Sequence, residues 1–257
     1  MKKTNLVAVC GKGGVGKTAF TAMMVKVLMD AEGTGNLLLI DADPAKGLTI
    51  ALDTEVRKTM GEVREEIIAA SRNASKEEKQ QLNDMIDYMV LEALTECDRH
   101  SLLAMGRSES KGCFCPVNSI LRGMIEELSE NFDTILIDGE AGVEQINRQV
   151  VRHLERLIVV SDATARGLQT VSLVKTMIEE EKVIQCDSLG LVLNRVQGNQ
   201  DMLRKAAEEV GVEILGMVPH DDEVAYYDLV GKPLTELPDD SISVAAIREI
   251  VEQHVLV

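Results

Sequence analysis

The sequence predicts an α/β fold in which a mainly parallel β-sheet is flanked by helices. Short apolar runs typical of strands recur along the chain, and helical patterns separate most of them. The chain is 45% hydrophobic but only 2% aromatic, so its core must consist of Val, Ile, Leu, Met and Ala, which parallel sheets buried on both faces favour. The 257 residues show no internal repeat and no low-complexity linker, so we expect one domain over residues 1–257.

Six apolar runs are expected to form the strands of this sheet. They are Leu6–Cys10, Leu37–Ile40, Thr134–Ile137, Leu157–Val160, Leu189–Leu193 and Glu213–Met217. Because helical patterns lie between most of these runs, they are expected to form βαβ units, whose strands run parallel.

Residues 55–110 interrupt this alternation, because they contain no convincing strand. Apolar residues in the second half of the segment recur at helical spacing, which predicts a helical insert packed on the sheet. A helical pattern resumes at Ser119–Leu128, and Pro116 and Asn118 are expected to mark its start.

The composition argues against several classes of partner. The net charge of −16 repels a phosphate backbone or an anionic membrane surface, so neither nucleic acid nor a membrane is an expected partner. The first apolar run ends in a glycine loop rather than a cleavage site, and no apolar stretch reaches the roughly 18 residues of a membrane span. Five cysteines, an odd number, argue against a disulfide framework, and we expect a cytoplasmic protein.

The stretch "CGKGGVGKT", Cys10 to Thr18, follows an apolar strand, precedes a helical pattern and fits G-x-x-x-x-G-K-[ST]. In such a loop the backbone N–H groups surround phosphate oxygens, while Lys17 reaches the β- and γ-phosphates and Thr18 can ligate Mg²⁺. The alternative is an ordinary glycine-rich turn, which the number of matched positions disfavours. The expected nucleotide-binding residues are Gly11, Lys12, Gly13, Gly14, Val15, Gly16, Lys17, Thr18 and Ala19.

The loop carries a second lysine, Lys12. With it, "KGGVGKT" resembles the deviant P-loop (Walker A motif) of the MinD, ParA, arsenic-pump and nitrogenase iron-protein class of ATPases. The resemblance implies that ATP is the nucleotide and that the protein forms a nucleotide-sandwich homodimer. In that dimer Lys12 reaches the partner subunit's phosphates, so both Lys12 and Lys17 take part in catalysis.

Three carboxylates follow predicted strands, Asp41 and Asp43 in "LLLIDADPAKG" and Asp138 in "TILIDGEAG". Ligands bind at the carboxyl ends of such strands, where carboxylates can hold Mg²⁺-bound water or orient an attacking water. The resemblance implies that Asp43 polarises water for hydrolysis and that Asp138 holds a magnesium-bound water, as we also expect of Asp41. Any one of the three could instead cap a helix.

Two later segments, "LVLNRV" and "MVPHDDEV", also end or follow strands. The resemblance implies that they contact the adenine base, through Asn194 and Arg195 in the first segment and through Pro219 and Asp221 in the second.

The stretch "KGCFCPVN" contains Cys113 and Cys115. In an extended segment this spacing projects both sulfur atoms to one side, and soft thiolates suit Zn²⁺, Ni²⁺ or Cu⁺. Two ligands are too few for a closed site, but a two-fold dimer supplies four. The alternative is a pair of ordinary buried thiols, which is our interpretation of Cys10, Cys97 and Cys186.

Other features of the sequence argue against particular members of this ATPase class. The C-terminal "SVAAIREIVEQHVLV" has one Arg and no Lys, unlike the basic membrane helix of MinD-type proteins. The acidic composition argues against a partition ATPase, and the Cys-x-x-Cys of iron–sulfur scaffold relatives is absent near the C-terminus. None of the four histidines shows the spacing of metal ligands.

The segments "GCFCPVNSILR" and "DGEAGVEQINR" resemble the CooC family of maturation ATPases, which serve carbon monoxide dehydrogenase and, in a close branch, acetyl-CoA synthase. The resemblance implies that Cys113 and Cys115 bind one Ni²⁺ or Zn²⁺ between two subunits and that nickel is inserted into the apo-enzyme. The second segment matches the family at Asp138, Glu140, Ala141, Gly142, Glu144 and Arg148. Glu144 and Arg148 could also form a structural i,i+4 pair.

Two rival hypotheses remain open. The chain could be a nucleotide-switched positioning or interaction ATPase, like MinD or ParA, with the two cysteines in the core and no metal function. It could also be an electron-donating ATPase with an iron–sulfur cluster that bridges a dimer, although relatives of that kind use cysteines far apart in sequence.

Overall fold

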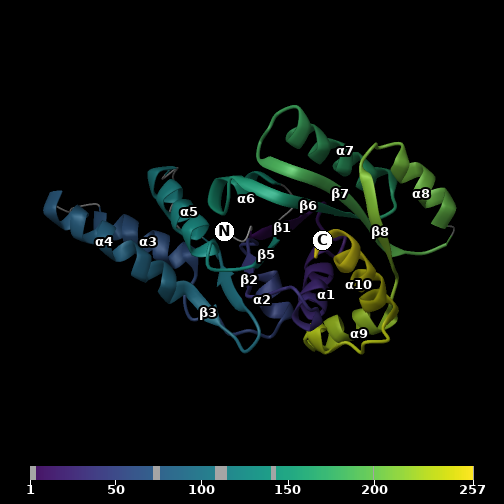
Figure 1. Cartoon of the computed structure of the whole chain (residues 1–257), viewed down its shortest axis with the longest axis horizontal. Coiled ribbons are helices and arrows are strands. Elements are labelled where there is room, and N and C mark those ends of the chain that lie inside the picture. Colours follow the sequence, from purple (N-terminus) through teal and green to yellow (C-terminus); the bar gives the residue numbers. More distant parts are fainter. Residues whose placement is uncertain (1–3, 72–75, 108–114, 140–142, 199, 257) are drawn as a thin grey trace.

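The computed structural model describes residues 4–71, 76–107, 115–139, 143–198 and 200–256. Within them, eight strands form one sheet in the order β3-β4-β2-β5-β1-β6-β7-β8 (Figure 1). Every neighbouring pair is parallel except β3–β4. The strands are β1 Asn5–Cys10, β2 Leu37–Asp41, β3 Leu94–Glu96, β4 Ser101–Ala104, β5 Thr134–Asp138, β6 His153–Ser161, β7 Gln185–Val196 and β8 Glu213–Pro219. The predicted fold class is confirmed, and all six predicted strands are present.

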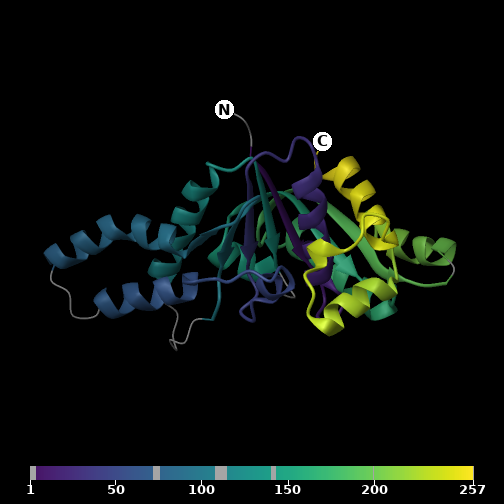
Figure 2. The ribbon, with the colours of Figure 1, turned by 90° about the horizontal axis from the view of Figure 1, so that it is seen from below.

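Helices cover both faces of the sheet (Figures 1 and 2). They are α1 Lys17–Asp30, α2 Gly47–Ala51, α3 Met60–Ser71, α4 Lys76–Ala93, α5 Cys115–Ser129, α6 Val143–Gln149, α7 Ala165–Glu179, α8 Gln200–Glu208, α9 Asp222–Val230, the 3-10 turn Leu234–Glu236 and α10 Ile242–His254. None of the described helices is long and apolar enough to cross a bilayer.

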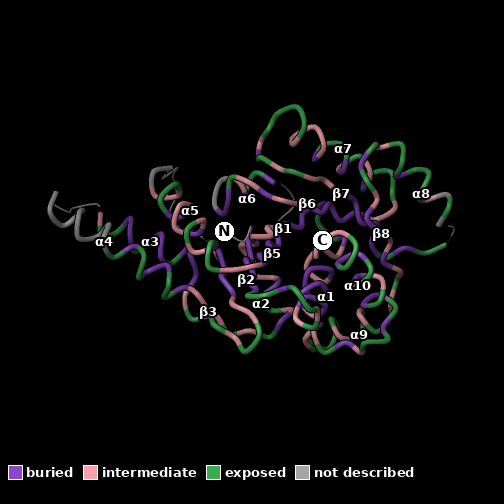
Figure 3. Tube along the Cα trace, in the orientation of Figure 1, coloured by how far each residue is buried: buried purple, intermediate pink, exposed green. Residues whose placement is uncertain are grey.

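Alternate residues of the central strands pack in two separate hydrophobic cores, one on each face of the sheet. On β1, Val7 and Val9 pack in the core formed with α1 and α10, whereas Ala8 packs in the core formed with α3 to α8. Successive side chains of a strand point to opposite faces, so a strand buried on both faces must be apolar throughout. The sheet therefore forms the buried centre of the molecule, with the exposed surface on the helices and loops (Figure 3).

The prediction that residues 55–110 contain no strand is wrong at β3 and β4. Helices α3 and α4 do project side by side from this region (Figure 2), but β4 pairs with β2 and extends the sheet. The physical reason is burial, because Leu102, Leu103 and Ala104 are fully buried beside β2. β3 then pairs antiparallel with β4 and forms the edge of the sheet.

Candidate nucleotide-binding site

The loop from Gly11 to Gly16 joins β1 to α1 at the carboxyl edge of the sheet. Its shape requires glycine where the chain turns left-handed, with φ values of 142° at Gly11, 85° at Gly14 and 84° at Gly16. A Cβ on Gly11 would lie 2.1 Å from the carbonyl oxygen of Val160 on β6. No side chain caps the first turn of α1, so its N–H groups face the loop, the arrangement that binds phosphate at helix N-termini.

We expect Gly11→Ala to destabilise the protein by about 1–3 kcal/mol, because the new Cβ would clash with Val160 and the backbone would be strained. Gly13 is the matched control, since a Cβ there meets nothing within 4 Å. Urea unfolding measures both variants, and Gly13→Ala should change the unfolding free energy by no more than about 0.5 kcal/mol. Equal midpoints for the two variants would show that the close approach of Gly11 to β6 does not constrain the loop.

The two lysines of the P-loop, Lys12 and Lys17, contact each other. The Lys17 ammonium donates to the carbonyl oxygen of Lys12 at 3.3 Å, so it bends back over the loop. Both side chains are half-buried. Lys17 is therefore held where a phosphate group bound by the loop would meet its charge.

Asp138, at the end of β5, lies beneath the first turn of α1. Its carboxylate accepts hydrogen bonds from the hydroxyls of Thr18 at 3.0 Å and Thr21 at 2.9 Å, and it is only 1% exposed. Burial raises the pKa of Asp138 to about 7, the nearby Asp41 adds to this rise, and the two hydroxyls and Lys17 oppose it. Thr21 is a site residue that the sequence prediction missed. Its position one helical turn after Lys17 does not mark it as a site residue until the strand that carries Asp138 is placed.

Asp41 is the register neighbour of Asp138 on β2 and is fully buried. Burial raises its pKa, and hydrogen bonds oppose the rise. The backbone N–H of Thr49 donates at 2.9 Å and its hydroxyl at 2.8 Å to one carboxylate oxygen, and the N–H of Asp43 donates at 3.2 Å to the other. Thr49, on α2, is a second residue that the sequence prediction missed.

Asp43 opens the loop between β2 and α2. One of its carboxylate oxygens accepts from the N–H of Ala45 at 2.8 Å, and its carbonyl accepts from the N–H of Lys46 at 2.9 Å. The loop returns to the P-loop at Gly47, where a Cβ would lie 3.4 Å from the Thr18 hydroxyl. Asp43 therefore belongs to the same edge as the P-loop, and its role toward water stays a prediction.

The oxygen atoms gathered here fit a magnesium ion. The hydroxyl of Thr18 and the carboxylates of Asp138 and Asp41 are hard donors of the kind that Mg²⁺ prefers, directly or through water. A bound Mg²⁺ would neutralise charge on the phosphates. The protein's own part is to keep the two carboxylates side by side through the β2–β5 pairing.

Asn194 and Arg195, at the end of β7, donate hydrogen bonds to the backbone of the P-loop. The buried Asn194 amide donates to the carbonyl oxygen of Val15 at 2.9 Å, and the Arg195 guanidinium donates to that of Gly14 at 3.4 Å. The structure thus brings both predicted residues to the site through contacts with the loop. Contact with a base stays a prediction.

Pro219 and Asp221 lie in a capping network at the start of α9 and α10. The carbonyl of Pro219 accepts from the Ser243 hydroxyl at 3.2 Å. Asp221 caps α9 by accepting from the N–H of Glu223 at 2.9 Å, and it accepts from the Ser241 hydroxyl at 2.7 Å. Partial burial alone would raise the pKa of Asp221, but these hydrogen bonds outweigh it and lower the pKa. Both residues therefore have a structural role here, and contact with a base again stays a prediction.

Cys113 lies outside the described residues, as do Glu140, Ala141 and Gly142. Cys115 is the first residue of α5, so the prediction that the pair lies in an extended segment is wrong at Cys115. Pro116 follows in the first turn, where its missing N–H costs no helical hydrogen bond.

Asn118 lies inside α5 and accepts from the guanidinium of Arg64 at 2.8 Å, so it does not mark the helix start. Glu144 is exposed on α6, and Arg148 belongs to the same helix. The predicted pairing of Glu144 with Arg148 stays untested.

The other three cysteines differ in burial. Cys10 is fully buried at the end of β1, and burial raises the pKa of its thiol to about 12. Cys97 and Cys186 are half-buried, and burial raises the pKa of both thiols. The interpretation as buried thiols is confirmed for Cys10 and too strong for the other two. All three remain protonated and weakly reactive at neutral pH.

The chain leaving β4 is fixed to the nucleotide edge. The N–H of Met105 donates to the carbonyl oxygen of Asp41 at 2.8 Å, and the carbonyl of Met105 accepts from the N–H of Gly61 at 2.8 Å. A Cβ on Gly61 would lie 2.4 Å from the carbonyl oxygen of Arg107, so α3 packs directly on this stretch. The backbone that leads toward Cys113 therefore starts beside Asp41.

Comparisons with known proteins agree with this site. The family model of the CobQ/CobB/MinD/ParA nucleotide binding domain matches residues 6–234. An uncharacterised ATP-binding protein of Methanocaldococcus jannaschii is 36% identical over 252 residues, which cover 96% of this chain and 97% of the relative. The carbon monoxide dehydrogenase accessory protein CooC of Rhodospirillum rubrum is 26% identical over 237 residues, which cover 88% of this chain and 87% of CooC.

Solved structures show the same fold. The septum site-determining protein MinD of Pyrococcus horikoshii, complexed with Mg-ADP, aligns with a TM-score of 0.68 and 20% identity over 98% of this chain and 96% of MinD. Since the family model covers most of the chain, the chain belongs to the CobQ/CobB/MinD/ParA nucleotide-binding family and is a P-loop ATPase.

Proposed function

We propose that the chain is an ATP-dependent metallochaperone that inserts nickel into apo carbon monoxide dehydrogenase or acetyl-CoA synthase. The observation that carries this proposal is the attachment of the segment before Cys113 to the nucleotide edge, through the hydrogen bond from Met105 to Asp41. Met105 precedes Cys113 by eight residues in the sequence, and in this proposal the thiol pair responds to the nucleotide. The similarity to CooC, itself an accessory protein of carbon monoxide dehydrogenase, supports the choice of client.

In this proposal ATP and Mg²⁺ draw two copies of the chain into a homodimer. Lys17 binds the phosphates of its own subunit, and Lys12 reaches those of the partner. Cys113 and Cys115 of both subunits then supply four thiolates, enough for one Ni²⁺ or Zn²⁺ cargo ion. Hydrolysis, assisted by Asp43, separates the subunits and resets the site. Neither nucleic acid nor a membrane takes part.

The decisive measurement is metal content per dimer, with and without a non-hydrolysable ATP analogue. With the analogue, we expect the wild-type protein to hold one more metal ion per dimer than Cys113→Ala/Cys115→Ala, because two thiolates from each subunit complete the site. Cys113→Ala/Cys115→Ala should lose this ion and still bind nucleotide. Cys97→Ala/Cys186→Ala is the matched control and should keep the ion.

Two outcomes contradict the proposal. If Cys113→Ala/Cys115→Ala bound metal like the wild type, the assignment of the ligands would be wrong. If the wild-type dimer formed with the analogue but bound no metal, a positioning or interaction ATPase would explain the protein better.

A further inference from the structure

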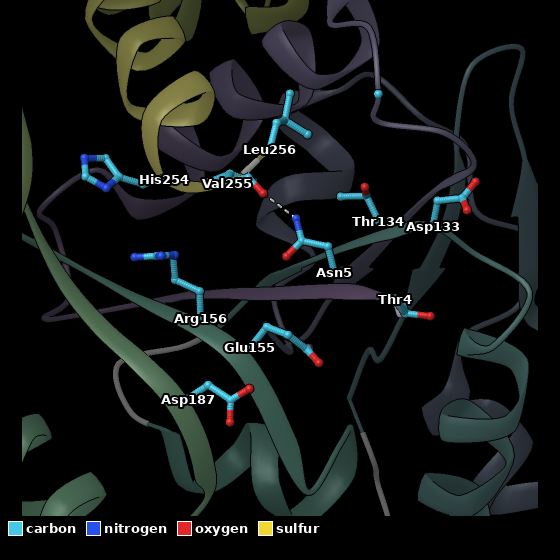
Figure 4. Close-up of a pocket in the computed structure, with 11 residues that line it drawn as sticks. Thr4, Asn5, Asp133, Thr134, Glu155, Arg156, Asp187, His254, Val255 and Leu256 are labelled. Carbon is cyan, nitrogen blue, oxygen red and sulfur yellow. Dashed lines mark hydrogen bonds between the residues drawn. The ribbon is translucent and has the colours of Figure 1, made fainter. Parts of the chain in front are cut away.

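A second group of potential metal ligands lies at the sheet edge opposite the P-loop. His153 and Glu155 are at the start of β6, and Asp187 is at the start of β7. One ligand atom from each lies within 4.8 Å of the others. Glu155 and Asp187, which Figure 4 shows on neighbouring strands, both line a cavity of about 410 Å³.

The strand register places these side chains together. His153 and Glu155 are two residues apart on β6, so both point to the same face of the sheet. Leu154 pairs with Cys186 and Arg156 with Ser188, which puts Glu155 opposite Asp187. Two carboxylates directly opposite each other on adjacent strands repel, and a positive charge between them relieves this repulsion.

The contacts orient all three groups. The Nε2 atom of His153 lies 2.9 Å from an Asp187 oxygen, and its Nδ1 atom lies 3.7 Å from the Oε1 atom of Glu155. The other oxygen of Glu155, Oε2, accepts from the backbone N–H of Leu6 on β1 at 3.1 Å. This hydrogen bond holds the Glu155 carboxylate in position, as outer-shell partners do for metal ligands.

We propose that His153, Glu155 and Asp187 bind a divalent transition-metal ion of the zinc type, separate from the nucleotide site and from the cysteine pair. One imidazole nitrogen and two carboxylates form a three-ligand set of the kind that holds Zn²⁺ with a position open to water. Mg²⁺ and Ca²⁺ fit less well, because they take oxygen ligands.

The three side chains need to move only a short distance to bind an ion together. Atoms about 2.1 Å from a zinc ion lie about 3.0–3.5 Å apart. Separations of up to 4.8 Å must therefore shrink by about 1–2 Å, whereas the Nε2 atom of His153 and the Asp187 oxygen, now 2.9 Å apart, must move slightly apart. Asp187 is exposed and His153 half-exposed, so both can rotate, while Glu155 stays fixed by Leu6. The competing explanation is that the contacts of His153 with Glu155 and Asp187 are structural and hold no ion.

The test is a Zn²⁺ titration of the chelator-stripped Cys113→Ala/Cys115→Ala protein against a chromophoric competitor. We expect one Zn²⁺ per chain, with affinity falling at least about tenfold in both Asp187→Asn and His153→Ala. Asp187→Asn keeps the shape of the side chain, so it remains informative if His153→Ala folds poorly. His220→Ala is the matched control, since His220 is also exposed and paired with a carboxylate, that of Asp222 at 3.2 Å. Its affinity should not change.

Absence of Zn²⁺ binding in the cysteine-free protein would overturn the proposal and favour a structural role for the His153 contacts. Binding that survives both Asp187→Asn and His153→Ala would also overturn it. Because the titration uses protein without Cys113 and Cys115, its result is independent of the proposed chaperone function.

Discussion

Lys17→Ala should lower ATP turnover by about 100- to 1,000-fold, the usual effect of removing one group that stabilises transition-state charge. Lys17 is held over the P-loop by its hydrogen bond to the Lys12 carbonyl, beside the first turn of α1. Alanine removes the positive charge that would meet the β- and γ-phosphates and leaves the backbone of the loop in place. Steady-state phosphate release measures turnover, and a fluorescent ATP analogue measures binding.

The variant Lys12→Ala distinguishes the role of Lys12 from that of Lys17. We expect this variant to bind nucleotide in the single subunit but to lose dimer formation and turnover, because Lys12 acts on the partner's phosphates in our proposal. Sedimentation with a non-hydrolysable analogue reports the dimer. Normal dimerisation and turnover by Lys12→Ala would contradict the proposed role, and normal turnover by Lys17→Ala would contradict the site itself.

Asp138→Asn should stabilise the metal-free protein at about pH 8 by a few kcal/mol while lowering ATP turnover at least about 100-fold. Burial raises the folded-state pKa of Asp138 from 3.8 to about 7. Keeping the ionised carboxylate buried therefore lowers stability as the pH rises from about 4 to about 7, and asparagine avoids this cost. Turnover falls because a neutral amide cannot support Mg²⁺ beside Thr18.

Urea unfolding in the presence of a chelator, at about pH 5 and pH 8, tests the stability effect. The gain from Asp138→Asn should be small at the lower pH and larger at the higher pH. Asp240→Asn, at an exposed position, should leave the pH dependence unchanged. If Asp138→Asn were less stable than the wild type at pH 8, the Asp138 carboxylate would be stabilised by its hydrogen bonds more than burial destabilises it.

The central strands could be predicted because they are apolar on both faces, as the two cores on either side of the sheet require. The strands β3 and β4 could not, because they have only three and four residues. The apolar stripe of α4 also runs directly into Leu94 at the start of β3, and periodicity alone does not separate a short strand from the end of a helix.

Some residues of the nucleotide-binding site could likewise be predicted from the sequence, and others could not. Lys17, Thr18 and Asp138 could be predicted because each stands in a run of sequence whose spacing is tied to strand, loop and helix. Thr21 and Thr49 could not, because a single hydroxyl in a helix has no spacing signal until the neighbouring strands are placed.

The residues that pack against the P-loop are synthesised much later than the loop itself, because they lie far along the sequence. Gly11 packs against Val160, and the Asn194 amide donates to Val15 from 179 positions further along the sequence. At about 5–20 residues per second, a ribosome adds these later residues roughly 10–40 s after the loop. A nascent chain therefore carries the phosphate-binding motif well before it can hold the motif in shape. We therefore expect nucleotide binding to begin only after β7 has joined the sheet.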